Sequence, residues 1–347
     1  MRAAPVSLSR EVNLLNESLE AEKTAAAHPP ARAAAVKGGR RWLPILAGPV
    51  VALTAIAAYL AVAGSRDEPS PKTDPQVISE QPVSLAEGWL VNSAGSWYLD
   101  REHRTYLEIT KFDFSAVRRA PIGDRVLTIG PNGDFGIGNI SNISSTDAVT
   151  VSDPELTGNL QWSPGGDRLA GQIVGKNPDF RIGFAVIEAA TGTLTKHWFD
   201  HKTHDCSQCG VRWSRDGREL VLAIANRSGG EGAELVSALQ LFDAATGTPT
   251  RRLPVKAMPS GPFSWSPDGK YVIADADVLK GQLQLIDVAT GATTPFAYDA
   301  MWATDDVLLA SKNYTVLTLR RDGTIAAQAT LGGKLTGLRP ITVGPPG

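Results

Sequence analysis

The sequence has few cysteines, little excess charge and no familiar catalytic signature in its 347 residues. A formal net charge of −2 gives no electrostatic reason to expect a nucleic-acid partner. Only 20% of the residues are charged and 42% are hydrophobic, which excludes a mainly disordered chain. The sequence lacks a G-x-S-x-G nucleophile elbow, a P-loop and a G-x-G-x-x-G motif followed by a helix. Neither a serine-hydrolase nor a nucleotide-binding class is therefore indicated.

Charge is absent altogether from residues 42–64, which predict one transmembrane helix, because at ~1.5 Å per residue this run spans a bilayer core of ~30 Å. Four basic residues and no acid occupy positions 32–41, whereas basic and acidic residues alternate after position 65. The positive-inside rule then places residues 1–41 in the cytoplasm and the rest beyond the cell membrane. A signal peptide cleaved after Ala63 is the alternative, and it leaves the large domain on the same side.

The segments that flank this span differ in character. Leu8, Val12, Leu15 and Leu19 would form one stripe of a short helix over about residues 7–23. This stripe is either a marginal helix in a mostly disordered tail or a docking helix for a cytoplasmic partner. Residues 65–84 are rich in proline, serine and charge, and we interpret them as an extended linker.

From about residue 85 the sequence lacks amphipathic helical stretches and shows a recurring turn motif instead. WSPDG at Trp265 returns as WSPGGD at Trp162, as WSRDGR at Trp213 and, more weakly, as RAPIGDR at Arg119, which indicates a repeat of about 50 residues. Proline sets φ in the turn, aspartate bonds the local backbone and glycine takes a positive φ. A buried tryptophan then fills the space between neighbouring sheets, with its ring N–H on a partner. The residues assigned to this structural repeat are Trp162, Pro164, Gly166, Trp213, Asp216, Gly217, Trp265, Pro267, Asp268 and Gly269.

A second turn follows each repeat, as EAATG at Glu188, DAATG at Asp243 and DVATG at Asp287. Each unit therefore has four strands, and a ring of such units buries both faces of every sheet. A degenerate unit starts at Trp302, and residues 88–110 lack a first strand that the end of the chain could supply. We expect an all-β, six-bladed β-propeller over residues 85–344, with seven blades as the alternative.

These repeats resemble those of the TolB-like, WD-repeat-like β-propeller family, in which a Trp-Ser-Pro-Asp-Gly turn precedes an apolar strand. WSPDGKYVIA and WSRDGRELVLA match that pattern closely, and WSPGGDRLA nearly so. The resemblance covers roughly residues 85–344 and implies a platform for protein or ligand binding in the cell envelope. It carries over no catalytic residue, because the motif is structural.

One cluster of potentially reactive residues lies in HWFDHKTHDCSQCGVRW, before Trp213. It contains the only two cysteines of the chain, Cys206 and Cys209, and three of its five histidines. A local disulfide between Cys206 and Cys209 is one interpretation, favoured by an oxidising exterior. A tetrahedral zinc site of His201, His204, Cys206 and Cys209 is the second, and free or redox-active thiols are the third.

The function that these observations predict is binding without catalysis or a cofactor. A single-pass membrane protein would present an extracytoplasmic propeller to a protein, peptide or glycan of the envelope, as a scaffold or as a sensor. The alternative is a metal-dependent hydrolase or lactonase that uses the central channel. For that alternative, Asp275, Asp277, Asp305 and Asp306 are the candidate cation ligands.

Overall fold

The computed structural model describes residues 81–347, except 110–115, 131–132, 144–148, 158, 176–180, 200, 205–209, 227–234, 277–280, 336–337 and 339. The chain divides into two compact units, Met1–Glu68 and Pro69–Gly347, and every described residue belongs to the second. The predicted tail, transmembrane helix and most of the linker therefore lie outside the described residues. Within the described part, no helix is long and apolar enough to cross a membrane.

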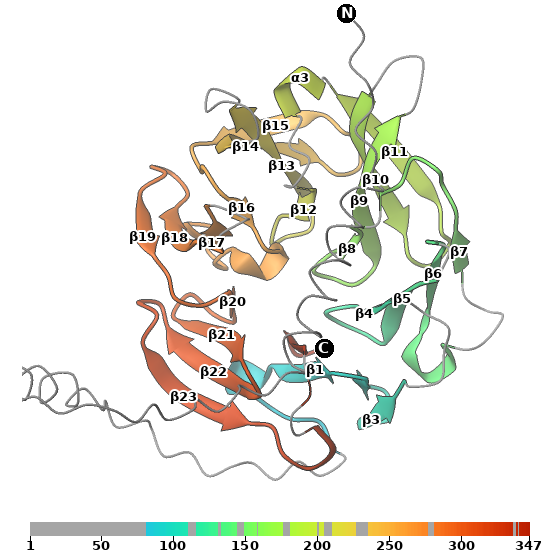
Figure 1. Cartoon of the computed structure of the whole chain (residues 1–347), viewed down its shortest axis with the longest axis vertical. Coiled ribbons are helices and arrows are strands. Elements are labelled where there is room, and N and C mark those ends of the chain that lie inside the picture. Colours follow the sequence, from blue (N-terminus) through green and yellow to red (C-terminus); the bar gives the residue numbers. More distant parts are fainter. Residues whose placement is uncertain are drawn as a thin grey trace, which may run out of the picture. The chain divides into compact units, whose positions relative to one another are not determined.

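The described residues form six four-stranded antiparallel sheets arranged as blades around a common centre (Figure 1). Blade 1 contains β24 (Ile341–Gly344), β1 (Leu90–Ala94), β2 (Trp97–Asp100) and β3 (Thr105–Glu108). Blade 2 contains β4 (Ala116–Arg119), β5 (Arg125–Ile129), β6 (Phe135–Asn139) and β7 (Val149–Val151). Blade 3 contains β8 (Gln161–Trp162), β9 (Arg168–Gly175), β10 (Arg181–Glu188) and β11 (Leu194–Phe199).

The second half of the ring repeats this plan. Blade 4 contains β12 (Arg212–Trp213), β13 (Glu219–Asn226), β14 (Leu235–Asp243) and β15 (Pro249–Leu253). Blade 5 contains β16 (Met258–Pro259), β17 (Tyr271–Asp275), β18 (Leu283–Asp287) and β19 (Thr293–Pro295). Blade 6 contains β20 (Ala300–Trp302), β21 (Val307–Lys312), β22 (Thr315–Arg320) and β23 (Ile325–Thr330). Helical structure in the described part is limited to α3 (His201–His204) and four short 3₁₀ turns. The all-β, six-bladed prediction is confirmed, and the seven-bladed alternative is wrong.

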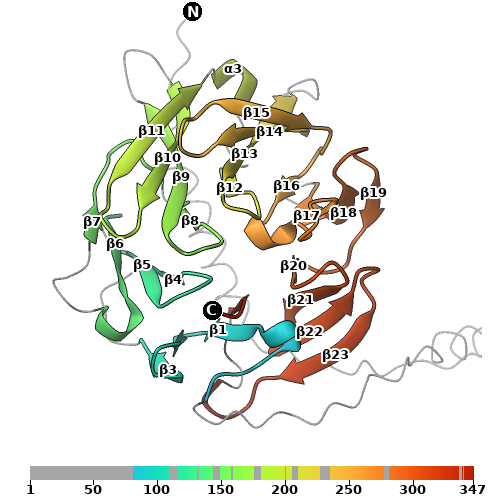
Figure 2. The ribbon, with the colours of Figure 1, turned by 180° about the vertical axis from the view of Figure 1, so that it is seen from behind.

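The two ends of the described chain close the ring in blade 1. Strand β24 pairs antiparallel with β1, with Leu90 opposite Gly344 and Val91 opposite Val343. Figure 2 shows the cyan first blade between the red last blade and the second blade. Strand β24 thus occupies the innermost position that β4, β8, β12, β16 and β20 occupy in the other blades. The predicted spare strand is confirmed, and it covers an edge that would otherwise be free to pair with another chain.

The repeated turn folds as its residues predict. Between β12 and β13, the Ser214 hydroxyl donates to Asp216 at 2.7 Å, and Gly217 has a φ of 70°. Between β16 and β17, Ser266 donates to Asp268 at 2.7 Å in the same way. These bonds form within five residues, so the turn geometry depends on local sequence alone.

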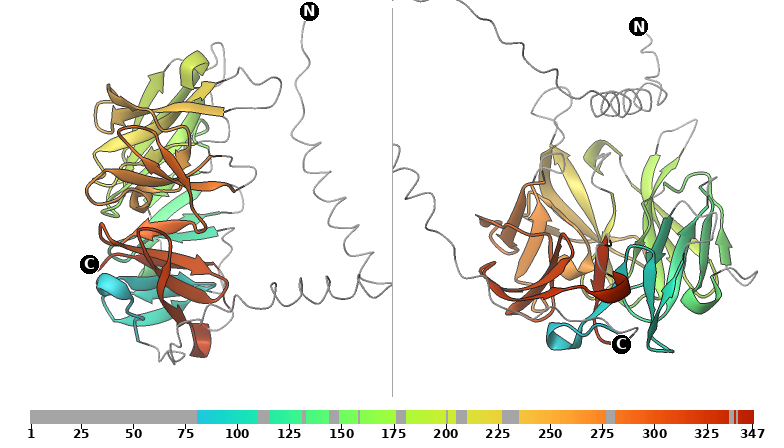
Figure 3. Two further views of the ribbon diagram at one scale, coloured as in Figure 1. Left: turned by 90° about the vertical axis from the view of Figure 1, so that its left-hand side faces the viewer. Right: turned by 60° about the horizontal axis from the view of Figure 1, so that its bottom comes forward.

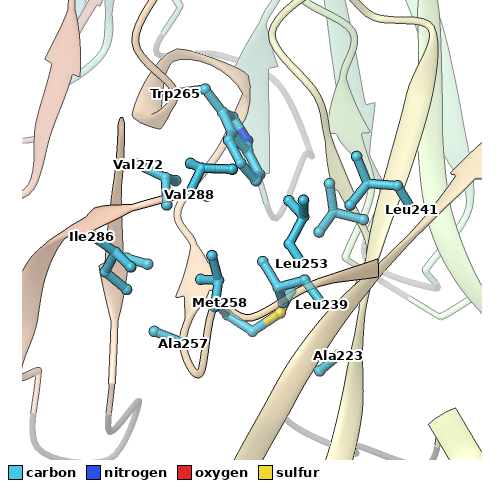
Figure 4. Packing of buried hydrophobic residues seen from close by; sticks show 13 residues of the cluster. Ala223, Leu239, Leu241, Leu253, Ala257, Met258, Trp265, Val272, Ile286 and Val288 are labelled. Carbon is cyan, nitrogen blue, oxygen red and sulfur yellow. The ribbon is translucent and has the colours of Figure 1, made fainter. Parts of the chain in front are cut away.

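The tryptophans pack between neighbouring blades, as expected. Trp265 joins residues of blades 4 and 5 in one cluster, which Figure 4 shows from close by with Leu239 and Leu241 on one side and Val272 and Val288 on the other. Trp265 itself follows a 3₁₀ turn, Pro262–Ser264, and meets Val272 through an isolated bridge rather than within a strand. The burial of such large apolar surfaces holds adjacent sheets together.

The expectation that each indole N–H has a partner is only half correct. The ring N–H of Trp162 donates to the Arg118 carbonyl at 2.9 Å, and that of Trp213 to the Gln161 carbonyl at 3.0 Å. The buried ring nitrogens of Trp265 and Trp302 have no hydrogen-bond partner among the described residues. An indole hydrogen bond therefore links blade 3 to blade 2 and blade 4 to blade 3. The Trp265 and Trp302 rings contribute apolar packing and no such bond among the described residues.

Candidate functional site: the central channel

The innermost strands are short and leave a cavity at the centre of the ring. Strands β8, β12 and β16 have two residues each. The cavity has a volume of about 720 Å³, and side chains of all six blades line it. One lining residue per blade, in blade order, is Asn92, Arg118, Gln161, Arg212, Phe263 and Met301. A concave site of this size with a few polar groups is the usual form of a ligand-binding site.

In blades 2, 3, 4 and 6, the residue before the tryptophan position of the repeat lines this channel, whereas Ser264 of blade 5 does not. Gln161 precedes Trp162, Arg212 precedes Trp213 and Met301 precedes Trp302. Arg118 holds the equivalent position in blade 2, where Arg119 replaces tryptophan. Side chains alternate along a strand, so the neighbour of the tryptophan projects from the opposite face of the blade.

Gln161 connects three blades across the channel wall. Its side-chain oxygen accepts from the Trp213 backbone N–H at 3.1 Å, and its side-chain nitrogen donates to the Ser260 carbonyl at 3.1 Å. The backbone carbonyl of Gln161 accepts the Trp213 ring N–H. The oxygen and the nitrogen of the amide group thus each form a structural connection, and together they link blades 3, 4 and 5.

Arg118 and Arg212 reach to the following blade in the same direction around the ring. Arg118 Nη1 donates to the Leu160 carbonyl at 2.9 Å, and Arg212 Nε donates to the Pro259 carbonyl at 3.2 Å. Arg212 Nη1 also donates to the Val211 carbonyl at 3.0 Å. Burial, and then the charge of Arg118, lower the pKa of Arg212. The two guanidinium groups are thus close enough to repel each other.

Arg119, next to Arg118, is neutralised within the fold. Its side chain is 1% exposed and forms an ion pair with Asp124, Nη2 to Oδ1, at 2.5 Å. Its Nε donates to the Leu99 carbonyl at 2.7 Å, and Asp124 also accepts the Arg101 backbone N–H at 2.7 Å. Burial, opposed by Asp124, lowers the pKa of Arg119 to about 10. Arg119 therefore joins blades 1 and 2 and adds no free charge to the channel.

A further arginine joins blades 4, 5 and 6. Arg215 stands where Pro164 and Pro267 stand in the related turns. Its Nη1 donates to the carbonyls of Trp265 at 3.0 Å and Trp302 at 2.9 Å. Burial lowers the pKa of Arg215, and Asp305 partly offsets that effect. The departure from the repeat pattern thus provides a connection across three blades.

Three of the four acids considered as cation ligands lie in the described residues, and these three do not converge. Asp305 and Asp306 lie in the turn between β20 and β21, and Asp305 accepts the Asp268 backbone N–H at 3.0 Å. Asp275 ends β17, about 13 Å of strand away from the turn that contains Asp268. Asp277 lies outside the described residues. The arrangement expected for a metal-dependent hydrolase is therefore not present among Asp275, Asp305 and Asp306.

A different acid, Asp299, lies near Asp275, and sequence reasoning missed it. Its carboxylate accepts the Ser260 hydroxyl at 2.9 Å. Desolvation, and then the Asp275 charge, raise the pKa of Asp299 although the residue is exposed. The two residues are 24 positions apart in different units, so no local pattern indicates their proximity.

The histidine and cysteine cluster is described only in part. Cys206, Cys209 and the side chain of His201 lie outside the described residues, so the disulfide, zinc and free-thiol interpretations remain predictions. The His204 ring packs edge-on against Phe199 and Phe242, with centroids 5.6 and 5.5 Å away. Among the residues that the structure describes, no group of three or more histidine, cysteine or acidic residues forms a metal site.

The strand order defines the protein as a six-bladed β-propeller closed by its last strand. A solved structure assigned to TolB from Agrobacterium tumefaciens aligns over 71% of this chain and 95% of that one, with 14% sequence identity and a TM-score of 0.41. No protein-family model and no curated protein sequence matches the chain. The fold assignment rests on the strand order and register described above.

Proposed function

We propose that this protein is a membrane-anchored binding or sensory scaffold whose extracytoplasmic propeller takes a segment of an envelope protein, peptide or glycan into its central channel. The observation that carries the proposal is the cavity of about 720 Å³, lined by side chains of every blade. Its wall combines apolar surface at Phe263 and Met301 with polar groups at Asn92, Arg118 and Arg212. Such a mixture suits a ligand that has both apolar and polar groups.

Hydrogen bonds also link the blades that form and support the wall, which favours an open channel that can bind a ligand. Gln161, Arg212 and Arg215 each connect different blades through backbone carbonyls. Ser93 and Thr342, which line the cavity in blade 1, share a hydrogen bond of 2.6 Å between their hydroxyls. A preorganised wall reduces the entropy that a ligand must lose on binding.

The membrane anchor, the extracytoplasmic location and a cytoplasmic partner of residues 7–23 belong to this proposal. They rest on the uncharged run at 42–64 and on the basic residues that precede it. A ligand in the channel on one side of the membrane and a tail on the other side would suit a sensor. A scaffold would need only the anchor and the propeller.

The experiment fills the channel and leaves the fold intact. Ala116 lines the cavity, so Ala116→Trp places an indole in the ligand volume. Ala326, exposed on the outer strand β23, provides the matched control Ala326→Trp. Full-length wild type and both variants are purified in detergent and used to capture cross-linked partners from native envelopes.

We expect one or more partners to be lost from Ala116→Trp and retained by wild type and by Ala326→Trp. Thermal unfolding of both variants controls for folding. Equal capture by all three proteins would rule out the channel as the binding site.

A further inference from the structure

Two guanidinium groups face the same channel at equivalent positions of the repeat. Arg118 and Arg212 each precede the tryptophan position of their blade, with Gln161 in the blade between them. All three residues line the cavity of about 720 Å³. The equivalence of the positions places the two arginines at a similar depth along the channel.

The backbone of the following blade holds both side chains in place. One bond from Arg118 Nη1 to the Leu160 carbonyl and one from Arg212 Nε to the Pro259 carbonyl restrain each guanidinium plane. Arg118 Nε and Nη2 and Arg212 Nη2 form no hydrogen bond to the described residues. Arg118 is an exposed residue, and Arg212 Nη2 is not an enclosed, solvent-free atom. The Nε and Nη2 edge of an arginine is the fork that binds two oxygens of one anion, and this edge is free at Arg118, whereas Arg212 offers Nη2 alone.

The charge of the pair is not compensated within the described part of the chain. Neither arginine takes part in an ion pair there, whereas Arg119 pairs with Asp124 and Arg251 pairs with Glu219. The pKa of Arg212 is lowered by burial and by Arg118, as expected for like charges in a partly dry site. Arg118 is exposed, but the partly desolvated charge of Arg212 is unfavourable without a counter-charge, and a bound anion reduces that cost.

We propose that Arg118 and Arg212 form an oxyanion subsite in the channel, which binds a carboxylate or phosphate group of the ligand. The inference rests on the proposed function, because it names the chemistry of the group that enters the channel. Phe263 and Met301, on the wall formed by blades 5 and 6, supply apolar surface for the rest of the ligand. Carboxylate and phosphate share the oxygen geometry that a guanidinium fork recognises.

The test uses the full-length protein in detergent, with sodium succinate and sodium phosphate as probes at constant ionic strength against sodium chloride. Binding is measured by calorimetry and by the shift in Tm. The variants are Arg118→Gln and Arg212→Gln, which keep an amide donor for the neighbouring carbonyl. Arg251→Gln is the matched control, because Arg251 lies on the outer strand β15 with its side chain 59% exposed.

We expect at least one probe to bind wild type and Arg251→Gln with equal affinity. The affinity of each channel variant for that probe should be about tenfold lower, or binding should be lost. Binding of succinate alone indicates a carboxylate ligand, and binding of phosphate alone indicates a phosphorylated one. Undiminished binding to both channel variants, or equal loss in Arg251→Gln, would overturn the proposal.

A second measurement covers the case in which a channel variant does not fold. In wild type, the bound probe should slow amide hydrogen exchange at residues 116–119 and 210–213 more than in the outer strands. Uniform exchange across the blades would also contradict the subsite. If Ala116→Trp abolishes partner capture and yet neither probe binds wild type, the proposed function stands and the oxyanion subsite fails.

Discussion

Val343 of the last strand lies directly opposite Val91 in one antiparallel ladder, although almost the whole described chain separates them. Both side chains are buried, Val91 completely and Val343 with 7% exposure. Figure 3 shows the ring of blades from its edge and from below, with the last residues beside the first blade. This pairing joins the two ends of the described chain in one blade and closes the ring.

Removal of the closing strand should therefore prevent stable folding. Truncation after Pro340 deletes β24, exposes the edge of β1 and removes the buried Ile341 and Val343. We expect loss of the cooperative unfolding transition and aggregation, measured by circular dichroism and size-exclusion chromatography. Truncation after Pro345 is the control, because it retains β24 and the carbonyl that accepts Arg101. A monomeric, cooperatively folded protein that ends at Pro340 would contradict the role of the closure.

The two kinds of buried indole allow the ring hydrogen bond to be measured by itself. Trp162→Phe removes the bond to the Arg118 carbonyl, whereas Trp302→Phe removes an N–H that has no partner among the described residues. Both substitutions remove similar volume from buried sites. We expect Trp162→Phe to lower the free energy of unfolding by about 1 kcal/mol more than Trp302→Phe, measured by urea unfolding. Equal losses would mean that packing alone accounts for the loss of stability at both sites.

Tyr106 predicts a loss of stability at alkaline pH. Its hydroxyl donates to the Val91 carbonyl at 2.7 Å and accepts the Val83 N–H at 3.3 Å, and burial raises its pKa to about 12. The folded protein therefore holds this proton more tightly than the unfolded chain, whose tyrosine pKa is about 10. The stabilisation is complete below pH 10 and is lost as the pH rises from 10 to 12, by about 2–3 kcal/mol in total.

The substitution Tyr106→Phe should flatten this part of the pH profile and lower stability at pH 7 by about 1–3 kcal/mol, because two polar groups lose their partner. Urea unfolding at several pH values measures both effects. Tyr314→Phe, at a ring that is 40% exposed, should keep the alkaline loss of wild type. An unchanged profile in Tyr106→Phe would assign the loss to other groups.

The blades were predictable because their turns are made by neighbours in the chain. Asp216 and Asp268 accept hydroxyl and backbone donors two residues away, and Gly217 and Gly269 adopt a φ of 70° and 71°. The missing strand of the first unit and the spare strand at the end of the chain likewise predicted the closure. The partners of the indoles were predictable only in part, because Trp265 and Trp302 meet no carbonyl at their ring nitrogens in the described residues.

By itself, the sequence determined the repeated turns and the four-stranded unit, since each depends on contacts within a few residues or on one hydrophobic period. It predicted six blades with seven as the alternative, and the tertiary structure decided for six. Only the tertiary structure decided which side chains share the channel. Arg118 and Arg212 are far apart in the chain and come together because the ring brings equivalent positions to one axis. Arg119 finds its carboxylate partner, Asp124, in the turn that follows its own strand, whereas Arg118 lines the channel.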